Sequence, residues 1–191
     1  MTNKKKLLLA VACMALAVCS LVTGTLAWLT AKTTPVVNTF APSNITLSLT
    51  GTTAEWKMIP GETYTYTPVV AVTSDIDCYL FVKFEELNSA STYLTYTSVL
   101  NDSNGWNQGD GTNIPINVWY REVGKDDATK SWHLLENDTI VVTGSAVNAD
   151  NIATAANAKL QYTAYAIQKD NILDANSDGT NVDEAWALLN P

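Results

Sequence analysis

Hydrophobic and polar residues alternate along several short segments of this chain, which is the pattern of half-buried β-strands. The clearest case is 77–87, where Cys78, Leu80, Val82 and Phe84 share the side that we expect to face the core. Further strands are predicted at 45–49, 63–72, 92–100, 114–123 and 159–168. Many short strands separated by turns predict an all-β fold, an antiparallel β-sandwich of jelly-roll-like type.

Several local signals refine this prediction. Pro60 and Gly61 form a turn dipeptide. Pro68 predicts an edge strand or a bulge within 63–72, because proline cannot donate to a sheet. Residues 132–135 and 139–142 resemble the two strands of a hairpin, and 147–158 is ambiguous, with a short helix as one option. A short C-terminal helix is predicted over 181–189, with Asn181 as its cap and Glu184 reaching back.

The N-terminus has the pattern of an export signal. Three lysines, Lys4 to Lys6, precede an apolar run from Leu7 to Val22, and small residues lead to Ala27. We expect a signal helix over 1–27, cleaved between Ala27 and Trp28, followed by a single domain over 28–191. An uncleaved membrane anchor is the alternative, although the run is shorter than the ~20 residues that span a bilayer.

Charge and cysteine content limit the partners of the mature chain. Removing the signal leaves eight basic against 19 acidic residues, a net charge of −11. Such a chain would repel the phosphates of nucleic acids and anionic membranes. Cys78 is the only cysteine beyond the signal, so no internal disulfide is possible, and we expect it to be a small buried hydrophobe. An exposed thiol that crosslinks subunits is the alternative.

The chain resembles the TasA/camelysin family of secreted Gram-positive proteins. The resemblance lies in the export region (Lys4–Leu7 and Gly24–Trp28), the first strands (Val37–Phe40, Ile45–Leu49 and Trp56–Glu62) and the end of the chain (Tyr162–Gln168 and Ala185–Trp186). Residues 88–157 have no counterpart. The resemblance implies a signal peptide processed by the SipW peptidase and a jelly-roll sandwich. It also implies extracellular biofilm-matrix fibres in which the N-terminal strand of one subunit completes the sheet of the next.

Assembly is therefore the expected function, with the protein secreted to the extracellular matrix or cell surface. Residues 28–40 are the candidate donor strand, because an apolar strand can pair with an open sheet edge on a neighbour. Its expected anchors are Trp28, Leu29, Val36, Val37 and Phe40. The expected partners are other copies of the chain, related matrix subunits and, during export, a signal peptidase. An ordinary first strand within its own subunit is the alternative.

Catalytic signals are weak, so we expect no enzyme. The sole histidine, His133, lies between Trp132 and Leu134 in a predicted strand. The chain has neither the His-Glu-x-x-His of zinc proteases nor the Gly-x-Ser-x-Gly of serine hydrolases.

A monomeric cell-surface binding module for calcium or glycan is the alternative function. Asp174, Asn176 and Asp178 match the start of an EF-hand loop, but position twelve is Ala185 instead of glutamate, so an Asp/Asn-rich turn is the simpler interpretation. Calcium is thus the only cofactor considered. A second oxygen-rich loop spans 101–111. Trp106, Trp119 and Trp132 either stack on sugars or, as we expect, pack within the sheets.

Overall fold

A computed structural model describes residues 44–51, 56–175, 177 and 179–189 of the chain. The expected signal segment 1–27 and the candidate donor strand 28–40 lie outside these residues. The described part contains ten strands and a few short helices.

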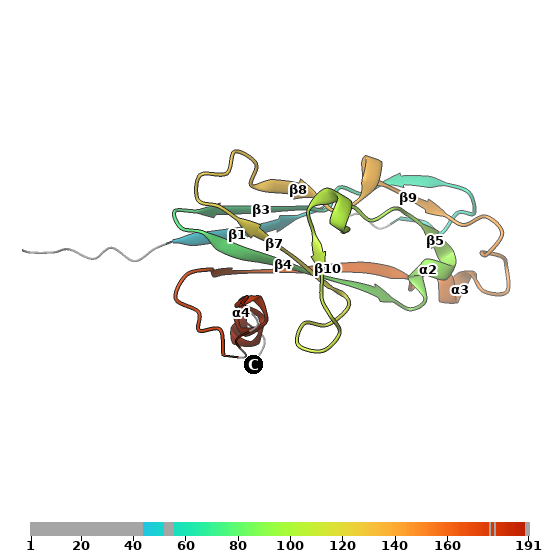
Figure 1. The fold of residues 1–191 in the computed structure, drawn as a ribbon. Coiled ribbons are helices and arrows are strands. Elements are labelled where there is room, and N and C mark those ends of the chain that lie inside the picture. The colour runs from blue at the N-terminus through green and yellow to red at the C-terminus, as the bar shows by residue number, and fades with distance from the viewer. Residues whose placement is uncertain (1–43, 52–55, 176, 178, 190–191) are drawn as a thin grey trace, which may run out of the picture. The chain divides into compact units, whose positions relative to one another are not determined.

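The strands form three antiparallel sheets arranged as a sandwich. One sheet has the order β10 (Lys159–Gln168), β4 (Cys78–Leu87), β7 (Val118–Val123) and β6 (Asn107–Gln108). The second has β1 (Ile45–Thr50), β3 (Val69–Ser74) and β8 (Ser131–His133), and the third β2 (Thr63–Thr65), β9 (Thr139–Val142) and β5 (Leu94–Thr95). The two three-stranded sheets lie end to end across the four-stranded sheet (Figure 1). The predicted all-β antiparallel sandwich is confirmed.

Two chain segments connect the two three-stranded sheets: residues 66–68 link β2 to β3, and residues 134–138 link β8 to β9. The predicted strand 63–72 is divided: β2 ends at Thr65, and β3 begins at Val69, directly after the buried Pro68. The predicted hairpin across 132–142 is wrong, because β8 pairs with β3 whereas β9 pairs with β2 and β5. A 3₁₀ turn over Glu136–Asp138, with Asn137 at φ 54°, redirects the chain between β8 and β9.

Backbone hydrogen bonds continue across this break. The Leu134 N–H donates to the Pro68 carbonyl at 2.9 Å, and the Tyr66 N–H donates to the Asp138 carbonyl at 2.7 Å. The two three-stranded sheets therefore act as one layer, bent at a position where proline cannot extend the ladder.

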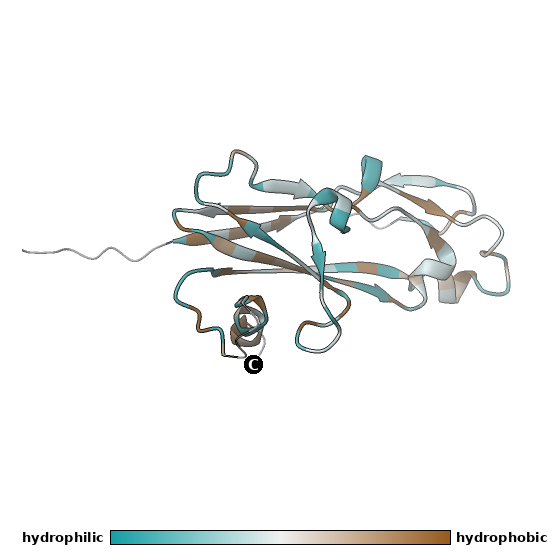
Figure 2. Ribbon diagram, in the orientation of Figure 1, coloured by the Kyte–Doolittle hydropathy of each residue, from teal (hydrophilic) through white to brown (hydrophobic). Residues whose placement is uncertain are grey.

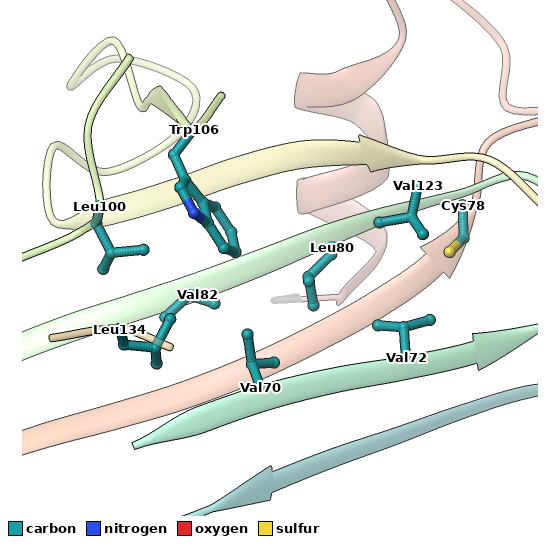
Figure 3. Close-up of a cluster of buried hydrophobic side chains, with 9 residues drawn as sticks. All are labelled: Val70, Val72, Cys78, Leu80, Val82, Leu100, Trp106, Val123 and Leu134. Carbon is teal, nitrogen blue, oxygen red and sulfur yellow. The ribbon is translucent and has the colours of Figure 1, made fainter. Parts of the chain in front are cut away.

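Strand β4 is buried on both faces over its first half. Cys78, Leu80 and Val82 point into the sandwich, where they join Val70, Val72 and Trp106 in the main core (Figure 3). The prediction for this side of the strand is confirmed, including the buried free thiol of Cys78, whose pKa is raised by burial. The opposite side of β4 is also buried, because Tyr79 and Phe81 belong to a second apolar cluster.

The second cluster is covered by the C-terminal helix α4 (Val182–Leu189), which was predicted correctly. Trp186 packs against Phe81 and Tyr165, with ring centroids 5.3 Å and 5.4 Å away. Asn181 anchors the start of the helix: its side-chain oxygen accepts the Tyr79 hydroxyl at 2.6 Å, and its amide donates to the Lys169 and Ile172 carbonyls. Figure 2 shows hydrophobic residues concentrated along β1, β3, β4 and α4.

The remaining predictions are met in part. Residues 92–100 form less strand than expected: the short helix α2 (Ala90–Tyr93) leads into the two-residue β5. Helix α3 (Ile152–Ala155) lies in the ambiguous segment, and a second 3₁₀ turn spans Asp102–Asn104. Pro60–Gly61 forms the predicted turn, closed by a hydrogen bond from the Glu62 N–H to the Ile59 carbonyl, with Gly61 at φ 82°. This positive φ is the reason for glycine at position 61.

Replacing Trp186 by alanine should lower the free energy of unfolding by about 3–5 kcal/mol, because it leaves a cavity between α4 and the sheet. Leu188, on the same helix, is 65% exposed, so Leu188→Ala should cost less than about 1 kcal/mol. Denaturant unfolding of the chain that starts at Trp28 measures both. Equal losses for the two variants would show that α4 is not docked as described.

Candidate functional site

The residues predicted to direct cleavage and strand donation lie outside the described part of the chain. This applies to Ala27 and Trp28 at the expected cleavage point, and to the anchors Leu29, Val36, Val37 and Phe40. Their roles stay predictions, and the structure bears on assembly only through the surfaces that such a strand would meet.

The predicted calcium loop is described only in part, because Asn176 and Asp178 also lie outside the described residues. One carboxylate oxygen of Asp174 accepts the Gly179 N–H at 3.1 Å, and Glu184 accepts the Ala175 N–H at 2.8 Å. A hydrogen bond with Glu184 raises the pKa of the Asp183 carboxyl. These contacts fit a turn that feeds α4, and calcium binding stays a prediction.

The second oxygen-rich loop uses its oxygens to hold its own backbone. The Asn101 side-chain oxygen accepts the Asn104 N–H at 3.1 Å at the start of the 3₁₀ turn. One carboxylate oxygen of Asp110 accepts the N–H groups of Thr112, Asn113 and Ile114 at 2.8, 3.0 and 3.1 Å. These hydrogen bonds hold the pKa of Asp110 below its usual range. The loop is thus built as a structural turn.

Trp106, Trp119 and Trp132 pack within the sandwich, as expected. Trp106 is fully buried, which excludes the alternative that it stacks on a sugar. Trp132 meets it edge-on, with ring centroids 6.1 Å apart, and Trp119 packs half-buried against the same core. The Arg121 guanidinium lies 4.3 Å from the Trp132 centroid and 5.2 Å from that of Trp106.

Arg121 is held by these rings, and it makes no ion pair with a residue in the described part of the chain. Its Nε is buried without a hydrogen-bond partner, and burial lowers the pKa of the guanidinium. A cation over aromatic faces is stabilised by the ring quadrupoles. The stack closes the margin of the sandwich between β7 and β8, on the side opposite β1 and β10.

His133 lies on the surface. Its Nδ1 contacts the Asp138 carboxylate at 2.9 Å, and its side chain is 58% exposed. The pair bridges β8 and the 3₁₀ turn that follows it. The prediction that the chain is not an enzyme remains a prediction.

Two long sheet edges on one margin of the sandwich have no neighbouring strand among the described residues. Among the described strands, β1 pairs only with β3 and β10 pairs only with β4, and β1 and β10 lie beside each other. The other edge strands, β2, β5, β6 and β8, have two or three residues each. Short strands and charges normally protect an edge, yet six-residue β1 has no charge and ten-residue β10 has only Lys159.

An aromatic groove of about 650 Å³ opens at one end of the sandwich. Trp56 and Tyr64 stack at 5.6 Å, and Tyr66 meets Trp56 edge-on at 5.5 Å. The Tyr64 hydroxyl donates to the Lys57 carbonyl at 2.5 Å, which fixes the segment before β2 over the groove. The remaining lining comes mainly from Leu94, Ile140, Val142 and the residues 156–160 that lead into β10.

Sequence reasoning missed this groove. The spacing of Tyr64 and Tyr66 places both rings on one face of a strand, which is a visible signal. Lys57 and Lys159 line the same groove although they are about a hundred positions apart in the sequence. No local sequence pattern predicts this, because it depends on which strands pair.

No protein-family model, curated protein or solved structure matches this chain. None of the helices in the described residues has the length and hydropathy needed to cross a bilayer.

The Asp110 turn should weaken in acid. Since the folded pKa is below the unfolded value of about 3.9, its contribution to stability is complete above that pH and is lost as the pH falls through the folded pKa. Asp110→Ala should remove this acid-dependent part, as measured by unfolding between pH 2 and 5. An unchanged pH profile in the variant would contradict the assignment.

The Arg121 stack should contribute measurably to stability. Arg121→Ala should cost about 1–2 kcal/mol through the lost contact with two rings, and Arg121→Lys should recover only part because it lacks the planar guanidinium. Lys125→Ala, at an exposed lysine of the following turn, is the control. If the arginine and control variants unfold at the same denaturant concentration, the stack is energetically neutral.

Proposed function

We propose that this chain is a secreted structural protein, similar to the TasA/camelysin family, that polymerises into extracellular fibres by donating its N-terminal strand. The observation that carries the proposal is the open margin formed by β1 and β10. Two long, almost uncharged edges side by side are a surface on which a further strand gains backbone hydrogen bonds.

The position of the N-terminus fits a contact between subunits. The described chain begins at Asn44, whose N–H donates to Asp75 at 3.0 Å, at the end of the sandwich where β3 turns into β4. Residues 28–40 are separated from Asn44 by the three residues 41–43, and a strand of that length extends for about 43 Å. This is enough to run along the whole of β10, which spans about 33 Å.

Strand addition also requires side chains that fill pockets on the acceptor subunit. The candidate anchors Trp28, Leu29, Val36, Val37 and Phe40 would fill positions between the two layers, where Leu47, Leu160 and Tyr162 are only half-buried.

A strand given to the next subunit makes a head-to-tail contact that does not close on itself, so it extends a filament. Cleavage between Ala27 and Trp28 during export would free the strand and act as the trigger. The alternative, a strand that stays within its own subunit, would fill the same margin and leave a monomer.

A cell-surface binding module is the second candidate function. The aromatic groove favours its glycan form, at a site other than the tryptophans considered from the sequence.

Deleting residues 28–40 should leave a folded monomer that does not elongate, because the subunit keeps its open edges but has no strand to donate. Electron microscopy of the 28–191 and 41–191 forms, with circular dichroism as a folding control, makes the comparison. A synthetic peptide of residues 28–40 should bind the truncated form, and a scrambled peptide of the same composition should not. Filaments formed by the truncated chain would rule out this mechanism.

A further inference from the structure

The aromatic groove differs in charge from the rest of the molecule. None of its described lining residues is acidic, although the chain carries 19 acidic residues. Lys57 and Lys159 stand at the groove, both exposed, and neither makes an ion pair with a described residue. By contrast, Lys83 and Lys169 are paired with glutamates. The groove thus concentrates free positive charge in an acidic protein.

The walls of the groove have the character of a carbohydrate site. Trp56 is 37% exposed and, with Tyr64 stacked on it, forms a ring platform fixed from below. The Tyr66 side chain is half-buried at the groove, and its hydroxyl makes no hydrogen bond with the described residues. Ring faces pack on the apolar faces of sugars, while hydroxyl and ammonium groups satisfy their polar edges. The volume of about 650 Å³ lies in the range of small-ligand sites.

We propose that this groove binds an acidic polysaccharide, one that contains uronic-acid units. A sugar ring stacks on Trp56 and Tyr64, and its carboxylate pairs with Lys57 and Lys159. The net negative charge of the protein does not prevent this, because the field of distant carboxylates is screened beyond about 8 Å at physiological salt. Glu86, opposite Leu160 in the sheet, is engaged by the Tyr96 hydroxyl.

The charge of the groove argues against the N-terminal segment as its occupant. Residues 28–43 contain Lys32 and no acidic residue, so they have no side-chain carboxylate that could pair with Lys57 and Lys159. The site therefore goes beyond the proposed polymerisation and is separate from it. A fibre subunit would carry one such groove per copy, so that weak individual binding would add up along a filament.

The test uses the 28–191 chain and two matched ligands, a galacturonic-acid hexasaccharide and its fully methyl-esterified form, which has the same rings without the charge. Calorimetry should find binding of the acid form and at least about tenfold weaker binding of the ester. The double variant K57Q/K159Q should lower the affinity for the acid form to that for the ester. Trp56→Ala should lose both ligands, Trp56→Phe should keep them, and Lys125→Gln, at an exposed unpaired lysine elsewhere, should change nothing.

Several results would overturn the proposal. These are no binding of the acid form at millimolar concentration, equal binding of acid and ester, an equal loss with Lys125→Gln, or displacement of the sugar by the peptide of residues 28–40. Near-UV circular dichroism confirms that each variant is folded. Electron microscopy of the same variants separates the two proposals, because K57Q/K159Q should still form filaments even though sugar binding is lost.

Discussion

Backbone N–H and carbonyl groups at a sheet edge need hydrogen-bond partners, and the described residues of this chain leave two long rows of them without a neighbouring strand. The constraint arises from the topology. β4 takes β10 on one side and β7 on the other, and β3 takes β1 and β8, so β1 and β10 become the outer strands of the two layers on the same margin. The opposite margin is closed by the Arg121 stack and by very short strands.

The rest of the fold makes this margin rigid. β4 has apolar side chains on both faces and is held between the sandwich core and α4, so β10 is paired along ten residues with an immobilised neighbour. The aromatic groove opens beside β2 and β9, beyond the bend at Pro68. The groove and the open margin thus follow from one topology and differ in chemistry: the groove carries two lysines and aromatic faces, whereas the margin offers mainly backbone.

Much of this fold was predictable from local patterns. Alternation located β1, β4 and β10 closely, and the Asn181 to Leu189 signal located α4. The errors occurred where pairing is decided by distant residues. The 132–142 segment has the composition of a hairpin. Its first half, β8, instead pairs with β3, and its second half, β9, pairs with β2, in a different sheet. Alternation in β4 predicted which side faces the sandwich core, whereas the burial of Tyr79 and Phe81 on the other side depends on the docking of α4, which no local pattern shows. Trp106 has a loop-like neighbourhood in sequence, yet the 3₁₀ turn before it directs its ring into the core.

Hydrogen exchange of the backbone amides in β1 and β10 tests the central claim most directly. In the 41–191 form, the outward-facing amides of these two strands should exchange rapidly, while those of β4 stay protected. In filaments of the 28–191 form the same edge amides should become protected, because they now donate hydrogen bonds to the carbonyl groups of a donated strand. Equal exchange of these amides in the truncated monomer and in the assembled protein would contradict the account.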